Sequence, residues 1–394
     1  MSPLLLWLAA VLVLALAWWW WRKPPAHRPG EAPPPSAPPK ARPEATPRQT
    51  PSAPPPVPPS TLPPAPVVVT SPPPALGPVP PELASFQWRP EAVLDSDRRQ
   101  ALETAVRGIP RPPRSMQQLL SPEFLTRASS TELSELVMGE PLIAAKVLAK
   151  VNSPYYGLRQ PVTGIGQAVT FLGINTVRSI CLQYMLADAF KPTLAEAQKA
   201  FDSIWQASGL ASELAVRLGK ALNLPDQSAL ATQVVLGFVG QLATASLIPA
   251  AGLPAWLHRD RLARARLEQD LLGLNAVEIG GMLMRSWELP NALVNDVSDM
   301  GRLLITPPLA IQPARLARIA LGYLCVRLGE RLALEPLPVE QALGLGDGPD
   351  THHLRAAIAQ DPVLAGLPAA LQAPDLVAAM RLATGQATPP AVDA

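Results

Sequence analysis

The chain has 394 residues, 50 of them proline, and a formal net charge of +2 from 33 basic and 31 acidic residues. This length allows two or three domains, but so much proline excludes a single continuous helical fold, so the composition is an average over unlike parts. Nucleic-acid binding normally needs a clustered basic surface, and the balanced charge gives no sign of one, so we expect no nucleic-acid partner.

The first 23 residues are predicted to anchor the chain in a membrane. Residues 4–21 are uncharged and end in four tryptophans, and Arg22 and Lys23 follow at once. Eighteen residues of helix are long enough to cross a bilayer, and a positive flank after the span favours a cytoplasmic body. We therefore expect a single-pass protein of the inner (cytoplasmic) membrane. A cleaved signal peptide, with a periplasmic body, is the alternative, because Ala15-Leu16-Ala17 resembles a cleavage site.

Residues 24–92 are predicted to form a flexible linker. About half of the prolines lie here, mixed with Ala, Ser and Thr. Proline fixes φ and removes backbone donors, so the segment is expected to be extended and solvated. Individual Pro-x-x-Pro pieces could bind a partner, but a simple spacer is the more economical interpretation of such a composition.

Helical signals begin at Ser129, which can cap a helix together with Glu132. Pro141 suits the first position of the next helix, which Asn152 is predicted to end. The turn Asn152-Ser153-Pro154-Tyr155-Tyr156-Gly157 follows, with half-buried tyrosines expected. A third helix is predicted from about Thr163, with Gly173 ending it in a left-handed conformation.

Apolar residues continue at helical spacing to the end of the chain, including a long helix from about Leu194. Strand alternation is missing, so we predict an all-α body. Cys181 and Cys325 lie in apolar runs and are expected to be buried free thiols, which favours a reducing compartment. Three tryptophans are predicted as core anchors, with the alternative that one lies in a groove: Trp205, Trp256 and Trp287.

The pattern resembles the HDOD domain, a helical module related to HD-type phosphohydrolases, over roughly residues 109–331. It rests on Glu140-Pro141, Asn152-Ser153, the Ala168-to-Gly173 step and Trp287-Glu288-Leu289-Pro290. The resemblance implies an HDOD-like helical bundle at 93–331, with a helical extension and flexible tail at 332–394. The family-motif positions are expected to be mainly structural: Glu140, Pro141, Asn152, Ser153, Gly157, Leu172, Gly173, Trp287 and Pro290.

HD enzymes use histidine and aspartate side chains to hold metals that activate water. Aligned with that motif, this chain has Gly240 and Gln241 where the His-Asp pair would lie, and Ala276 and Met300 at later histidine positions. We therefore expect no catalytic residue, no metal and no other cofactor. His258 is interpreted as part of a solvated basic helix, and His352-His353 as the first turn of a helix capped by Asp350 or Thr351.

Our leading hypothesis is a membrane-tethered, non-catalytic signalling or scaffold protein whose HDOD-like domain binds an unknown protein partner. A metal-dependent phosphohydrolase with an altered site is the second hypothesis. An adaptor that spans the cell envelope is the third. The sequence leaves open whether a small ligand occupies a pocket between the helices near Gly240 and Glu278, where the metal ligands of HD enzymes would lie.

Overall fold

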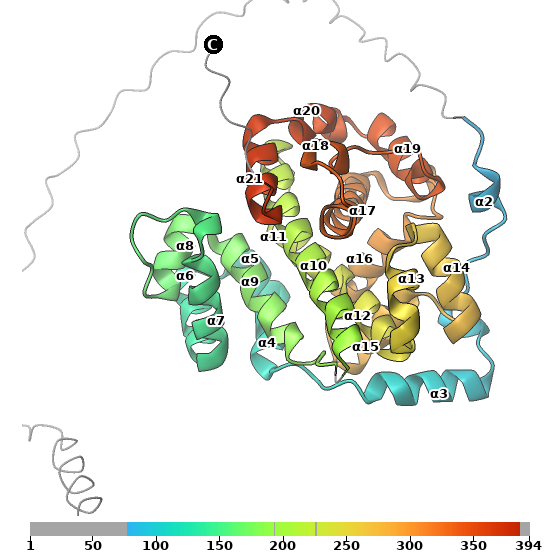
Figure 1. Ribbon diagram of the computed structural model, residues 1–394, viewed down its shortest axis with the longest axis horizontal. Helices are drawn as coiled ribbons and strands as arrows, with labels where there is room; N and C mark the ends of the chain where they lie inside the picture. The colour runs from blue at the N-terminus through green and yellow to red at the C-terminus, as the bar shows by residue number, and fades with distance from the viewer. Residues whose placement is uncertain (1–76, 193, 225–226, 387–394) are drawn as a thin grey trace, which may run out of the picture. The chain divides into compact units, whose positions relative to one another are not determined.

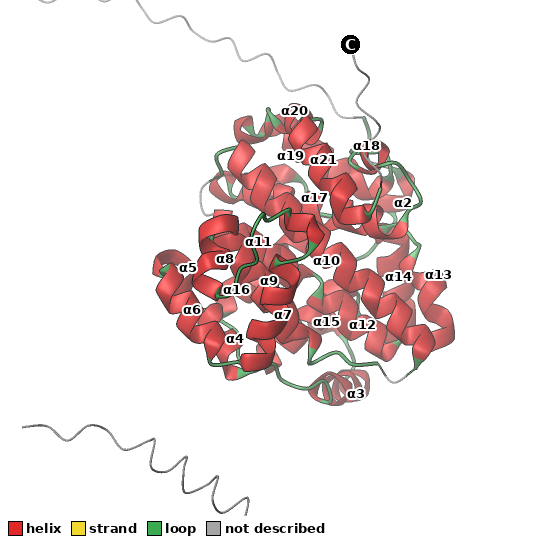
Figure 2. Cartoon of the chain, turned by 60° about the vertical axis from the view of Figure 1, so that its left-hand side comes forward, coloured by secondary structure: helices red, strands yellow, loops and turns green. Residues whose placement is uncertain are grey.

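A computed structural model describes residues 77–192, 194–224 and 227–386. The predicted anchor and most of the predicted linker lie outside these ranges. Within them every regular element is a helix, as the uniform red of Figure 2 shows, so the predicted all-α fold class is confirmed.

The body begins with a strap, residues 77–113, that runs along one side of the bundle before the HDOD-like helices (Figure 1). Its elements are α2 (Pro81–Ala84), η1 (Glu91–Val93) and α3 (Ser96–Arg107). Leu83 is buried, and the Arg89 backbone NH donates to the Gln269 side chain at 2.9 Å. Residues 77–92 were assigned to the linker from their proline content, but these contacts tie them to the body.

Two groups of helices follow the strap. The first group is α4 (Arg114–Leu119), α5 (Pro122–Arg127), α6 (Ser130–Met138), α7 (Pro141–Val151), η2 (Pro154–Tyr156), α8 (Ile165–Leu172) and α9 (Ile174–Ala187). The second is α10 (Ala195–Ala221), α11 (Gln227–Gly237), α12 (Val239–Leu247), η3 (Ala250–Gly252), α13 (Leu253–Leu257), α14 (Arg261–Leu272), α15 (Ala276–Ser286), α16 (Asn291–Arg302), η4 (Pro308–Ala310) and α17 (Pro313–Leu334).

The C-terminal helices pack on the long helices α10 and α17 (Figure 1). They are α18 (Val339–Ala342), η5 (Pro349–Thr351), α19 (His352–Gln360), η6 (Pro362–Leu364), α20 (Leu367–Leu371) and α21 (Pro374–Thr384). Helix α10 packs against α9, α11, α17 and α21, so it lies at the centre of the body.

Local signals at α6 and α7 act as the sequence predicts. The Ser129 backbone NH donates to Glu132 at 2.6 Å, and the Glu132 NH donates back to the Ser129 hydroxyl, which completes the capping box. Pro141 opens α7 and Asn152 ends it. Gly173 ends α8 at φ 82° but ψ 153°, so the predicted left-handed cap is wrong. This extended ψ instead lets α9 begin at the next residue.

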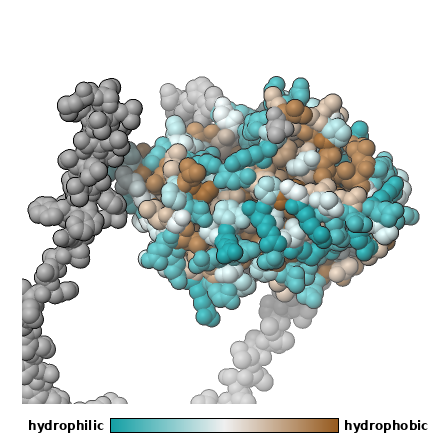
Figure 3. Space-filling view, turned by 90° about the horizontal axis from the view of Figure 1, so that it is seen from below, coloured by the Kyte–Doolittle hydropathy of each residue, from teal (hydrophilic) through white to brown (hydrophobic). Residues whose placement is uncertain are grey.

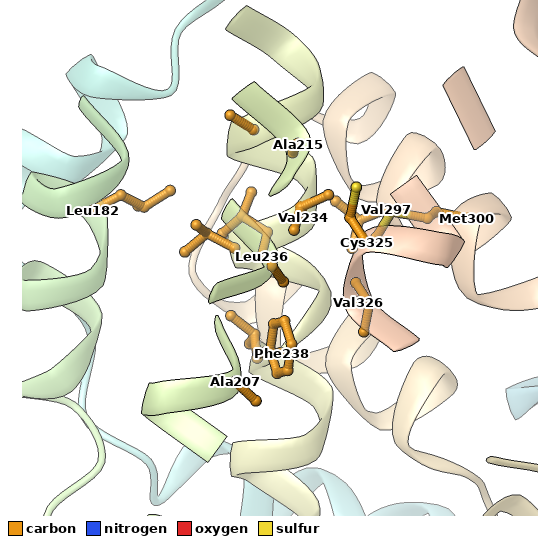
Figure 4. Close-up of a cluster of buried hydrophobic side chains, with 14 of the residues drawn as sticks. Leu182, Ala207, Ala215, Val234, Leu236, Phe238, Val297, Met300, Cys325 and Val326 are labelled. Carbon is orange, nitrogen blue, oxygen red and sulfur yellow. The ribbon is translucent and has the colours of Figure 1, made fainter. Parts of the chain in front are cut away.

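The core contains the cluster drawn in Figure 4, where side chains of α9, α10, α11, α16 and α17 meet. Cys325 lies in this cluster, and both cysteines are buried and free, as predicted. Trp256 and Trp287 are buried core anchors, whereas Trp205 is half-buried. Trp205 lines a cavity of about 180 Å³, so the alternative prediction, that one tryptophan lies beside a groove, applies to it.

Candidate functional site

The four degenerate HD positions come together in space. Gly240 and Gln241 lie on α12, Ala276 opens α15 and Met300 lies on α16. Gly240, Ala276 and Met300 share the lining of a cavity of about 20 Å³, and Gln241 and Ala276 line a neighbouring cavity of about 40 Å³. The four positions aligned with the HD motif therefore come from three helices that meet around these two cavities. The space between the helices is nearly filled.

Helix α12 approaches α15 most closely at Gly240. A Cβ atom at this position would overlap the backbone carbonyl of Ala276, and a Cβ at Gly280 would lie 2.8 Å from the Gly240 Cα. Real Cβ atoms do not come this close to backbone atoms. Two glycines therefore let the helices touch backbone to backbone, and a histidine at position 240 would require the helices to separate.

Met300 fills the other side of this place. Its thioether packs against Gly322, and its methyl carbon would be 2.7 Å from a Cβ at Gly237. Figure 4 shows Met300 in the same buried cluster as Val297 and Cys325. A flexible thioether suits an irregular gap of this kind, and it offers a hard metal no good ligand.

Gln241 belongs to a buried polar network. Its side-chain amide donates to Glu330 of α17 at 2.5 Å, and Glu330 also accepts from Arg264 at 2.6 Å and Arg261 at 3.3 Å. Burial alone would raise the pKa of Glu330, but the charges of the two arginines, with the hydrogen bonds, hold it below its usual value. Gln241 thus gives a neutral hydrogen-bond donor to Glu330, which is already paired with two arginines.

A second buried carboxylate, Glu268, lies beside this network. It accepts from the Trp256 indole at 2.8 Å and from the Ala276 backbone NH at 2.7 Å. Burial raises the pKa of Glu268 against the opposing charge of Arg264 and these two hydrogen bonds. Both carboxylate oxygens therefore accept hydrogen bonds from the protein itself, which gives Glu268 a structural role at the start of α15.

The strap covers this region from outside. Trp88 donates to Glu278 at 2.9 Å, and Arg302 donates to the same carboxylate at 2.6 Å. Trp88 also lines the 40 Å³ cavity beside Gln241. Sequence reasoning missed Trp88 because its neighbours are proline-rich, although a lone tryptophan in such a segment is itself a signal of docking.

The histidines lie elsewhere. Within the described ranges, no group of three or more His, Cys, Asp or Glu side chains is arranged to hold a metal ion. His352 and His353 open α19 as predicted, but neither Asp350 nor Thr351 caps the helix with its side chain. The Asp350 carboxylate instead pairs with Arg327 at 2.7 Å.

The interpretation of 258–266 as a solvated basic helix is wrong for its inner face. Asp260 caps α14 by accepting from the Ala263 NH, and this turns Arg261 and Arg264 toward Glu330. Arg264 is buried. The missed signal is Glu330, the only acidic residue of α17, because a buried charge needs a partner.

Most family-motif residues fix turns and helix ends. Glu140 accepts from the Ser115 hydroxyl at 2.8 Å, and the Asn152 amide exchanges two hydrogen bonds with the Val162 backbone. Gly157 adopts a left-handed conformation with φ 58°. Trp287 ends α15, and its carbonyl accepts from Gln117 at 3.0 Å.

The remaining motif positions occupy helix boundaries or lack a polar contact. Pro141 opens α7, Leu172 is the last residue of α8, and Pro290 precedes α16. The Ser153 hydroxyl has no hydrogen-bond partner among the described residues. These placements fit structural roles, and none of the nine residues lines the two small cavities beside Gly240 and Gln241.

One stretch of the described residues is long and apolar enough to cross a membrane, Ala229–Leu247, and 83% of it is buried inside the body. The bent pair Pro362–Leu371 and Pro374–Thr384 passes the same test only when both helices are taken together. Burial of this degree is typical of a core helix.

Comparison with known proteins shows which family and which solved structures this chain is similar to. The HDOD domain profile matches residues 109–300. A protein from Marinobacter aquaeolei, named for a supposed role in signal transduction, aligns over 77% of this chain and 69% of its own, with 21% identity and a TM-score of 0.51. The sequence matches no curated protein.

Two further solved structures are similar over nearly their whole length. An HDOD domain protein of unknown function from Geobacter sulfurreducens is 16% identical over 72% of this chain and 98% of its own, with a TM-score of 0.48. A supposed phosphohydrolase from Shewanella amazonensis is 22% identical over 73% and 98%, with a TM-score of 0.45. Through residues 109–300, this chain belongs to the HDOD domain family.

Proposed function

We propose that this chain is a non-catalytic, membrane-tethered HDOD protein that works by binding another protein. The observation that carries the proposal is the backbone contact at Gly240. The Ala276 carbonyl occupies the space that any side chain at position 240 would need, so the helices are packed for contact with each other. Gln241 and Met300, on either side, are committed to the Glu330 network and to the core.

A surface for the partner is available on the first helical group. Helices α6, α7 and α8 contact one another, and each carries one large exposed apolar side chain: Met138 is 61% exposed, Leu142 74% and Phe171 62%. Exposed apolar side chains on neighbouring helices offer apolar area that association can bury. On the face seen in Figure 3, small apolar patches are separated by hydrophilic surface.

The proposal includes the N-terminal anchor, which rests on sequence alone. An apolar span followed by Arg22 and Lys23 supports attachment to the inner membrane with the body in the cytoplasm. A tether raises the local concentration of the body near membrane-bound partners without fixing its orientation.

The test compares three forms of the full-length chain extracted from membranes in detergent: unchanged, Leu142→Ser with Phe171→Ser, and Leu309→Ser. Leu309 is 87% exposed on η4 and serves as the matched control. We expect the same protein to co-purify with the unchanged and control forms, and at least tenfold less of it with the double variant. Equal recovery with all three forms, or metal-dependent phosphate release by the purified chain, would overturn the proposal.

A further inference from the structure

A third cavity, of about 180 Å³, lies behind the tyrosine turn and apart from the degenerate HD positions. Its walls come from the end of α7, the turn itself, α9 and α10, and Leu382 and Ala383 of α21 close one side. The turn that the sequence singled out is thus one wall of a cavity that the C-terminal helix completes. We call it the turn cavity.

Uncharged polar side chains form part of its lining. Ser179 of α9 is 3% exposed, and its hydroxyl has no hydrogen-bond partner in the described part of the chain. Ser212 of α10 is also buried, half-buried Gln183 adds an amide, and exposed Gln206 adds another at the rim. A buried hydroxyl without a partner is costly, and Ser179 is among the residues that line the cavity, so a ligand that hydrogen-bonds with its hydroxyl would relieve this cost.

Three aromatic side chains supply another part of the lining, beside aliphatic ones. The Tyr155 and Tyr156 rings meet edge to face at 4.6 Å, and half-buried Trp205 lies on the α10 side. Burial, with the nearby Glu213 carboxylate, raises the pKa of both tyrosines, so they stay neutral at physiological pH. Aromatic faces of this kind bind flat rings well.

Of the two charged residues that line the turn cavity, Glu213 is already paired and Lys150 lies at the rim. Glu213 pairs with Arg217 at 2.7 Å, and the Lys150 ammonium lies over the Tyr155 ring at 5.9 Å, at the exposed rim. An anionic or cationic ligand would find no unpaired opposite charge on the inner wall, whereas a neutral ligand with donors and acceptors would meet hydroxyls and amides.

Gly209 keeps the cavity open. A Cβ at this position of α10 would have one neighbour within 4 Å, the Gln183 side-chain oxygen at 3.6 Å, which is an ordinary contact distance. A larger side chain at 209 would therefore enter the cavity without striking the backbone.

We propose that the turn cavity binds a small, uncharged, flat heterocycle that carries hydrogen-bond donors and acceptors, of the size and class of a nucleobase. The proposal is independent of the protein partner and of the HD positions. A ligand held here would touch the tyrosine turn, α9, α10 and α21 together.

Ligand-observed NMR and calorimetry on the full-length chain in detergent would test this, with adenine, hypoxanthine, cytosine and uracil as probes and indole as an apolar comparison. We expect at least one base to bind more tightly than indole. Gly209→Leu should weaken that binding at least tenfold, and Ser179→Ala roughly three- to tenfold, as expected for one lost hydrogen bond.

Ser208→Ala is the matched control. Ser208 is buried on α10 with an unpartnered hydroxyl, like Ser179 on α9, but it does not line the turn cavity, so binding should be unchanged. Circular dichroism would show that each variant folds, and the Ser179 and Ser208 pair decides the result if Gly209→Leu does not fold. No binding by any base, tighter binding of indole, or equal weakening by Ser179→Ala and Ser208→Ala would overturn the proposal.

Discussion

Glu330 is a buried carboxylate that is contacted from two other helices. It accepts a hydrogen bond from Gln241 of α12 and forms ion pairs with Arg261 and Arg264 of α14. Removing one member of such a buried network leaves charge without a partner, which is why these networks are sensitive to single substitutions even where their net contribution is small.

We predict that Glu330→Gln destabilises the protein by roughly 3 kcal/mol at pH 7, because buried Arg264 and half-buried Arg261 lose their counter-charge. Urea denaturation of the full-length chain, followed by circular dichroism, would measure it. Asp347→Asn, which breaks the exposed pair with Arg355, is the control and should cost less than about 1 kcal/mol.

The difference in stability between the unchanged and Glu330→Gln proteins should depend on pH. The pKa of Glu330 is lowered in the folded protein, so its contribution is present above the ordinary value of 4.5 and is lost as the pH falls through the lowered folded value. The stabilities of the unchanged and Glu330→Gln proteins should therefore converge in acid. A constant difference down to pH 3 would contradict this account of Glu330.

At the scale of elements, the contact between α12 and α15 decides what the degenerate site can hold. A Cβ at Gly240 meets backbone of α15, and backbone cannot move aside as a flexible side chain can. The two helices would have to separate along their shared core.

We predict that Gly240→Ala destabilises the protein by about 1–3 kcal/mol or more, as overpacking does. Gly209→Ala, also within a helix but facing open space, should be neutral or stabilising by about 0.5–1 kcal/mol, because glycine is the poorer helix former. Thermal melting of both variants would compare them. Equal melting temperatures would show that α12 and α15 can separate freely.

Helix positions could be predicted from local signals such as Ser129, Pro141 and Asn152, because capping and proline geometry act within a few residues. The convergence of Gly240, Gln241, Ala276 and Met300 followed from the family resemblance. Three features depend on contacts between distant segments, and a local pattern can mark one residue without giving its partner: the Glu330 network, the docking of Trp88 and the cavity behind the turn.

At the scale of the whole molecule, the proposed membrane tether would hold the helical body on one side of the membrane. Two buried free cysteines fit a reducing compartment, in agreement with the orientation proposed from Arg22 and Lys23.

We predict that alkaline phosphatase fused to the C-terminus of the full-length chain stays inactive, while a fluorescent protein fused there is bright at the cell periphery. Deleting residues 4–21 should move the fluorescent fusion into the soluble fraction. Active phosphatase would place the body outside the cytoplasm and favour the envelope-spanning alternative. Mass spectrometry of the purified chain distinguishes a retained anchor from a cleaved signal peptide.

The glycine pair at 240 and 280 also limits how this protein could be re-engineered. Writing a histidine and an aspartate back into positions 240 and 241 would not recreate a metal centre, because the imidazole would be driven into the backbone of α15. A designer would first have to reshape α15 and α16 to widen the gap, and also supply Glu330 with a new donor in place of Gln241. Conversion to a hydrolase therefore requires helices α12 and α15 to be moved apart, which two substitutions alone would not achieve.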